Sequence, residues 1–265
     1  MKRLIALLMS ITLILCFAAC SKGNTEGTDG TENNGTTKKV DALDVTEHKK
    51  PDTTAPAPGE LVPAIIDKDE GEAYKTIVAE QKYSDVEGES VTKEGIFTTI
   101  LYQFDGTTRY YVWGYSDKDM KDCWQWELNV KDPSNLPKNG SRVVVTGSIE
   151  YNEGAMDKIW LKEPSITVKE AYNGETFDVD MATMSPTLAR VEVMAISSYK
   201  DAFDGKTISA YGKIITANLL GHPTDDNGWQ IHFSSEEEVP EKGTHAIVTG
   251  VISDGIIENA KVAAR

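Results

Sequence analysis

The sequence predicts a mainly β protein, with two small tandem five-stranded barrels that follow an export signal and an unstructured tether. Three observations lead to this fold class. One set of motifs occurs twice, the segments between turns alternate apolar with polar residues, and the leader is followed by a stretch with almost no apolar residue. Alternation with a period of two places one side of a strand in a core and the other in water.

The N-terminus has the features of a signal peptide. A positive start at residues 2–3 is followed by an apolar run over residues 4–17. This run is shorter than the roughly 20 residues that a membrane-spanning helix needs, but it fits a signal peptide. It leads into Ala18-Ala19-Cys20, which resembles the lipobox of bacterial lipoproteins, so we expect cleavage before Cys20 and a lipid on its thiol. The alternative is an ordinary secretory signal.

Residues 20–60 form the predicted disordered tether. They are mainly Gly, Thr, Asn, Ser, Lys and acidic residues, and they end in a Pro- and Thr-rich run over residues 53–58. Such a segment buries too little apolar surface to offset the entropy of folding. A flexible chain spans about 5–6 Å × √n, so it holds the folded part some tens of ångströms from the bilayer. We expect the folded part on the extracytoplasmic face of the cell membrane.

The charge of the chain is strongly acidic. It contains 27 Lys and Arg against 42 Asp and Glu, a net charge of −15. Removing residues 1–19 takes away Lys2 and Arg3 and no acid, which leaves 25 against 42, or −17. Nucleic-acid binders neutralise phosphates with Lys and Arg, so this balance argues against a nucleic-acid partner.

Cysteine usage is sparse. Cys16 lies in the leader and Cys20 is the expected lipidation site, so the folded part keeps only Cys123. One thiol makes neither an internal disulfide nor a cysteine-rich metal site. Cys123 is followed by Trp124 and has no nearby His, and we interpret it as a structural thiol.

The folded part contains an internal repeat. Residues 136–149 align with residues 239–252 without a gap, and further matches precede them in the same order. The matched pairs are Pro137 and Pro240, Gly140 and Gly243, Gly147 and Gly250, Ile149 and Ile252, Trp124 and Trp229, Tyr83 and Tyr199, Gly88 and Gly205, and Gly95 and Gly212. We therefore interpret the folded part as two copies of one duplicated unit.

Each copy is predicted to consist of short strands. The expected strands cover residues 96–104, 109–115, 123–130, 141–150 and 158–168 in the first copy, and 206–218, 229–234, 244–253 and 256–263 in the second. Trp124, Trp126 and Leu128 alternate with Gln125 and Glu127, which places the first set in a core. The same alternation follows Trp229.

A small barrel suits these strands. Gly147 and Gly250 lie in mid-strand, where the missing side chain permits a sharp bend. About five strands per copy, a bent strand and variable loops are typical of an OB-fold barrel. A pair of β-sandwich domains is the alternative fold.

The chain resembles the tRNA-anti-like group of bacterial lipoproteins with OB-fold domains. The resemblance covers about residues 83–168 and 199–265. It rests on the Tyr-x-Asp…Gly entry, the strands of Gly95 and Gly212, and the Val-Thr-Gly-x-Ile strand of each copy. It implies OB-fold domains but no ligand residues, because members of this group generally lack an established function. Export and the acidic charge argue against a tRNA role here.

The expected domains are a first OB-like domain over residues 61–168 and a connector with a second OB-like domain over residues 169–265. A short amphipathic helix over residues 69–81 leads into the first barrel. Residues 169–198 link the two copies, and within them residues 190–193 fit a strand or a helix, so we leave both open.

The strongest candidate ligand-binding residues are Tyr111, Trp113 and Tyr115. If Val112 points into the barrel, these three aromatic side chains project outward from the second strand, where OB barrels often hold oligosaccharides or oligonucleotides. Beside an acidic surface, a sugar or a peptide is the favoured ligand. The alternative is that the three aromatic residues belong to the core. The second copy lacks this cluster.

Two acid-rich turns are candidate metal sites. The first contains Asp117, Asp119 and Asp122 and the second covers residues 225–228. Neither has the spacing of a calcium loop, and the Asp-Asn-Gly sequence is typical of a hairpin turn. We therefore expect no metal and no cofactor.

Catalytic motifs are absent from the sequence. His222, His232 and His245 are isolated, and no HExxH or GxSxG pattern and no phosphate-binding glycine loop occurs. We expect a non-enzymatic module, anchored in the membrane by lipid, that binds a carbohydrate, a peptide or an envelope protein. The alternatives are a structural or assembly component of an envelope complex and, third, a hydrolase.

Overall fold

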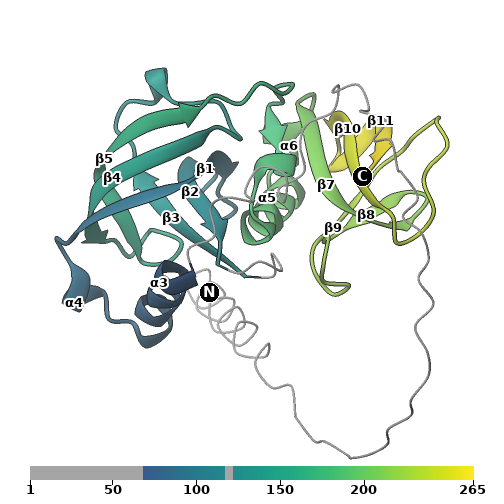
Figure 1. Ribbon diagram of the computed structural model, residues 1–265. Helices are drawn as coiled ribbons and strands as arrows, with labels where there is room; N and C mark the ends of the chain where they lie inside the picture. The colour runs from purple at the N-terminus through teal and green to yellow at the C-terminus, as the bar shows by residue number, and fades with distance from the viewer. Residues whose placement is uncertain (1–67, 117–121) are drawn as a thin grey trace, which may run out of the picture. The chain divides into compact units, whose positions relative to one another are not determined.

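The structure, a computed structural model, describes residues 68–116 and 122–265 (Figure 1). The predicted signal peptide, Cys20 and the tether lie outside the described residues, as do Asp117 and Asp119 of the first acidic turn. The described part is mainly β, with two sheets and short helices, so the predicted fold class is confirmed at that level.

The first sheet is a closed ring of five strands. Its strands are β1 (Ser90–Leu101), β2 (Thr108–Tyr115), β3 (Cys123–Asn129), β4 (Arg142–Tyr151) and β5 (Ile159–Glu170). They pair in the order β1-β2-β3-β5-β4, and β1 also pairs with β4. All pairs are antiparallel except β3 and β5, which run parallel over only two residue pairs, beginning at Leu128 and Leu161. This short parallel pairing closes the ring.

Side-chain parity identifies the inside of the ring. Val112 pairs with Phe97 on one side and Trp126 on the other, and residues directly opposite each other share a face. A Cβ atom added to Gly95 would lie 2.8 Å from the side chain of Val112 and 2.9 Å from the ring of Trp124. This face is therefore filled by packed side chains and forms the barrel core.

The second sheet repeats the same strand order. Its strands are β7 (Thr207–Thr216), β8 (Leu219–Gly221), β9 (Gln230–His232), β10 (His245–Ser253) and β11 (Ile256–Ala264), with β6 (Val179–Asp180) beside β7. They pair in the order β11-β10-β7-β8-β9. A parallel bridge joins Phe233 to Ile257, where the first sheet has Leu128 and Leu161. The sequence predicted neither β6 nor β8, and its strand over residues 206–218 corresponds to β7.

Backbone hydrogen bonds recur at the aligned glycines. The amide of Gly88 donates to the carbonyl of Ile149, and that of Gly205 donates to Ile252, both at 2.8 Å. The amides of Gly140 and Gly243 donate in the same way to Phe97 and Ile214, at 2.9 and 2.8 Å. These bonds support the internal repeat.

Unusual backbone geometry also recurs in pairs. Two non-glycine residues of β5 and its approach have positive φ, Lys158 at 66° and Glu163 at 48°. When Leu161 is aligned with Ile257, they correspond to Asp254 at 47° and Asn259 at 50°. The strand pairing is irregular at Gly147 and Gly250, the two positions at which the sequence predicts a bend.

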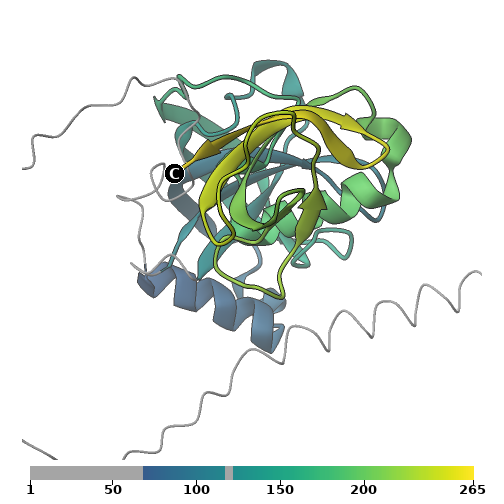
Figure 2. The same ribbon diagram turned by 90° about the vertical axis from the view of Figure 1, so that its right-hand side faces the viewer.

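Helices precede each sheet. They are α3 (Lys68–Glu80), α4 (Tyr83–Val86), α5 (Pro186–Ser198) and α6 (Lys200–Phe203), with single 3-10 turns η1 (Pro133–Asn135) and η2 (Met181–Thr183). The helix expected over residues 69–81 is confirmed as α3, which lies against β3 (Figure 2). In the region left open between strand and helix, residues 186–198 are helical. A 13-residue helix thus leads into both copies.

Local sequence explains where α5 begins and which side it buries. The hydroxyl of Ser185 accepts a hydrogen bond from the amide of Leu188 at 3.1 Å, and Pro186 occupies the first turn. A Ser cap followed by Pro is a strong start signal for a helix. The buried residues are Leu188, Ala189, Glu192, Val193, Ala195 and Ile196, a stripe with helical spacing.

We predict that Gly95→Ala and Gly212→Ala each destabilise the protein by about 1–3 kcal/mol, the usual cost of overpacking. A Cβ at these positions would lie 2.5 Å from the carbonyl oxygen of Trp113 and 2.2 Å from that of Gly221, and backbone atoms cannot move aside cheaply. Urea unfolding measures the change. Gly154→Ala, whose Cβ meets only the end of the Asn152 side chain, is the control. Unchanged midpoints for both Gly95→Ala and Gly212→Ala would contradict this packing.

Candidate functional site

The predicted aromatic platform lies on the expected face of β2, but it is not exposed. Val112 points into the barrel, so Tyr111, Trp113 and Tyr115 lie on the outer face. Their side chains are nevertheless buried, with exposures of 0%, 0% and 5%. The expectation of an open platform is wrong, because other parts of the chain cover this outer face.

The connector between the two sheets covers one end of the outer face. The indole Nε1 of Trp113 donates to the backbone carbonyl of Thr183 in η2 at 3.1 Å. The Sγ atom of Cys123 lies 3.6 Å from the hydroxyl of Thr187 at the start of α5. The amide of Leu101 donates to the buried carboxylate of Glu192 at 2.8 Å. Each contact joins the first barrel to the connector.

Helix α3 and the loop between β4 and β5 cover the other end. The hydroxyl of Tyr111 donates to Glu127 at 3.2 Å, and the amide of Met156 in the loop donates to the same carboxylate at 2.8 Å. The hydroxyl of Tyr74 on α3 donates to Asp157 at 2.6 Å. The outer face of β2 and β3 is therefore a second core in this protein.

Arg109 joins Glu127 on this covered face to the loop between β4 and β5. Its guanidinium donates to Glu127 at 3.0 Å and to the carbonyl of Gly154 at 2.7 Å, and it stacks 3.7 Å from the ring of Tyr102. Burial raises the pKa of Glu127, although Arg109 opposes the shift. Because Arg109 and Glu127 are paired with each other beneath the covering segments, we interpret this ion pair as structural.

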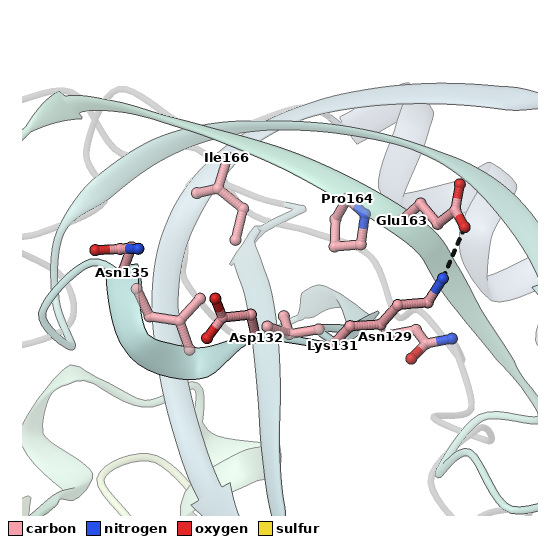
Figure 3. A pocket seen from close by; sticks show the side chains of 9 residues that line it. Asn129, Lys131, Asp132, Asn135, Glu163, Pro164 and Ile166 are labelled. Atoms are coloured by element: carbon pink, nitrogen blue, oxygen red, sulfur yellow. Dashed lines mark hydrogen bonds and ion pairs between the residues drawn. The ribbon is translucent and has the colours of Figure 1, made fainter.

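An open pocket lies elsewhere, where β3 and β5 diverge (Figure 3). Its volume is about 440 Å³, which falls within the range of small-ligand sites. Pro164 and Ile166 on β5 face Lys131 and Asp132 on the segment that follows β3. The remaining lining residues are Asn129, Val130, Asn135, Leu136 and Glu163.

The two copies differ at a proline beside this pocket. In the second copy, Ser234 donates its amide to the carbonyl of Ile257, and Ala260 donates its amide to the carbonyl of Ser234, both at 2.8 Å. The residue aligned with Ala260 is Pro164, which has no N–H to donate. The bond made by Ala260 in the second copy therefore has no counterpart from Pro164.

The connection after β3 contributes the opposite wall. It is two residues longer in the first copy, because Trp124 precedes Leu136 by twelve positions whereas Trp229 precedes Val239 by ten. The extra length forms the turn η1, which Asp132 caps by accepting a hydrogen bond from the amide of Ser134 at 3.0 Å. This wall of the pocket thus comes from a segment that is longer in the first copy than in the second.

The pocket combines charged, amide and apolar groups. Lys131 and Glu163 form an ion pair at 2.8 Å across it, and both side chains are exposed. The ion pair lowers the pKa of Glu163, and hydrogen bonds from Ser134 lower the pKa of Asp132, so both carboxylates are ionised at neutral pH. The pocket can bind a small polar molecule by hydrogen bonds, but it places no nucleophile beside a base.

The other sequence candidates lie apart from this pocket. Within residues 68–116 and 122–265, no group of three metal-ligating side chains comes together. Asp226 pairs with Lys213, while Asp225 accepts a bond from the amide of Asn227 as in a turn. His232 is exposed on β9.

Sequence reasoning missed the pocket because none of its residues stands out alone. The signals were available only by comparing the two copies, which differ by Pro164 and by the longer connection after β3. No protein-family model and no curated protein matches this chain. The function therefore has to be argued from the geometry of the chain itself.

We predict that the free energy of unfolding falls as the pH rises from 5 to 8. Burial raises the pKa of Glu192 from its ordinary 4.5 to about 8 and that of Asp180 to about 7. The folded state holds these protons more tightly than the unfolded chain, so the stabilisation is complete below pH 4.5 and is lost as the pH approaches 8.

Glu192→Gln keeps an acceptor for the amide of Leu101 and removes this titration, so it should flatten much of the slope. The expected difference is on the order of 3 kcal/mol, since each unit of pKa shift corresponds to about 1.4 kcal/mol. Urea unfolding at several pH values measures it, with the exposed Glu236→Gln as control. Parallel slopes for wild type and Glu192→Gln would refute a buried carboxyl at this junction.

Proposed function

We propose that this chain is a lipid-anchored extracytoplasmic protein whose two OB-like barrels form a non-enzymatic binding module. Two tandem OB barrels are supported by the strand order β1-β2-β3-β5-β4 of the first sheet and by the same order in the second, with its bridge from Phe233 to Ile257. OB barrels are five-stranded Greek-key barrels of this kind. Membership of the tRNA-anti-like lipoprotein group is part of the same proposal.

The single observation that carries the binding role is the open pocket between β3 and β5. It is concave, its polar groups are accessible, and it is formed by features that the second copy lacks. Polar side chains converging on a concave surface are the usual basis for a binding-site hypothesis. The usual ligand face of an OB barrel is covered here, whereas this pocket is open.

A role as an assembly component of an envelope complex is the second candidate. Its support is a set of large apolar side chains that remain exposed among the described residues, with Phe104 at 58% and Tyr151 at 47%. Exposed aromatic residues favour protein contacts when they form one broad patch. Loss of complex formation in Phe104→Ser, with the pocket intact, would favour this second function.

The anchor is proposed to be a lipid on Cys20. In the described part of the chain, no helix is both long and apolar enough to span a bilayer. The positive start, the apolar run and the small residues before Cys20 support the proposal.

We predict that Cys20→Ala abolishes lipidation and releases the chain from the membrane fraction. Metabolic labelling with a radioactive fatty acid and partition into detergent measure the two effects. A single acyl chain gives only marginal membrane binding, so complete retention requires the multiple acyl chains of a bacterial lipoprotein. Cys123→Ala is the matched control and should remain labelled. Labelling that survives Cys20→Ala would rule out this anchor.

A further inference from the structure

The pocket between β3 and β5 carries an inference about its ligand, which rests on the proposed binding function. We propose that it binds one uncharged sugar unit, a pyranose with free hydroxyl groups. The argument uses the amides at the pocket, its net charge and its apolar wall. It does not involve the outer face of β2 and β3, which the chain itself covers.

The amides provide the recognition groups. The side chains of Asn129 and Asn135 line the pocket, and neither makes a hydrogen bond to another described residue. An Asn side chain offers both a carbonyl acceptor and an NH₂ donor. A sugar hydroxyl also donates and accepts, so it matches such an amide better than a purely donating or purely accepting group does.

The charges select against anions. Asp132 and Glu163 are negative and Lys131 is positive, which leaves the lining with a net charge of −1. The one positive group is already paired with Glu163 at 2.8 Å. The chain as a whole carries −15. Phosphates, nucleotides and acidic sugars are therefore repelled by the site and by the surrounding field.

The walls fit the other side of a pyranose. Pro164, Ile166 and Leu136 are half-buried and present aliphatic surface to the pocket. A pyranose ring has C–H groups that lose water favourably on such a surface, while its hydroxyls remain at the polar edge. A small inorganic ion or a strongly charged metabolite makes no use of this wall.

The second copy offers an internal comparison. At the place aligned with Asn129 it has Ser234, whose backbone amide and carbonyl are both bonded to β11. In the first copy Asn129 is itself paired with Lys162 of β5, so the copies differ at this position in the side chain, which is an amide in the first copy and a hydroxyl in the second. Sugar binding is expected in the first copy alone.

The test is a saturation-transfer NMR titration of the full-length chain in a detergent without a sugar headgroup. The probes are methyl glucoside and N-acetylglucosamine as neutral sugars, with glucuronic acid, inorganic phosphate and trialanine as alternatives. We expect the neutral sugars to bind with a dissociation constant on the order of 1 mM, as suits so small a ligand in an open pocket. Glucuronic acid should bind about tenfold more weakly because of its charge.

Matched variants locate the binding. Asn129→Ala combined with Asn135→Ala should weaken sugar binding about tenfold through the loss of several hydrogen bonds. Ser234→Ala, the aligned position of the second copy, should change nothing. Glu163→Gln brings the lining from −1 to neutral and should narrow the gap between glucuronic acid and methyl glucoside. Thermal unfolding of each variant confirms that the fold is retained.

The outcomes separate this inference from the proposed function. If trialanine or phosphate binds and the double Asn variant abolishes that binding, the sugar inference is overturned while a ligand-binding pocket stands. If no probe binds, or if sugar binding survives the double variant unchanged, the sugar inference falls. If no probe binds, the proposed binding role of the pocket is contradicted as well. Saturable binding of neutral sugar that the double variant removes supports both.

Discussion

The burial of one side of the first barrel is the constraint on which the other features depend. Tyr111 and Trp113 lie on the outer face of β2, where α3, the β4–β5 loop and the connector cover them. The connector joins the barrel by the bond from Trp113 to Thr183 and by that from Leu101 to Glu192. Burying aromatic rings of this size is worth several kcal/mol in total, far more than any single surface contact.

This covering decides where a ligand can bind. An OB barrel with an open β2–β3 face can use stacked aromatic rings, whereas here those rings are core residues. An accessible concavity lies instead beside the shortest strand pairing of the barrel, the parallel pairing of β3 and β5 over two residue pairs. Pro164 removes a donor at that join, and the longer connection after β3 supplies the far wall. Closure of the barrel and formation of the pocket are therefore linked.

Sequence patterns predicted the parts of the fold that local periodicity controls. Alternation around Trp124 predicted β3 and the aligned glycines predicted the repeat, whereas the sequence left both faces of β2 open as the side that points into the barrel. They could not show whether the outer face of β2 was open, because its cover comes from residues some 70 positions away, such as Thr183. Burial by distant segments leaves no local pattern.

Local sequence marks the start of helix α5, although the apolar pattern alone leaves strand and helix both open. Ser185-Pro186 is a cap followed by proline, and the repeat itself implies a helix before the second copy to match α3 before the first. The pocket was harder to foresee. Its walls contain positions at which the two copies differ. A difference such as that between Pro164 and Ala260 can be interpreted only when the strand pairing is known.

The covering of the first barrel by the connector can be tested directly with a disulfide. In a chain with Cys16→Ala and Cys20→Ala, Thr187→Cys would place a second thiol beside Cys123, since the Sγ of Cys123 and the Thr187 hydroxyl are 3.6 Å apart. Mild oxidation should then form an intramolecular disulfide, seen by mass spectrometry as the loss of both free thiols in the monomer. Two thiols that remain free, or that link only separate molecules, would contradict the arrangement.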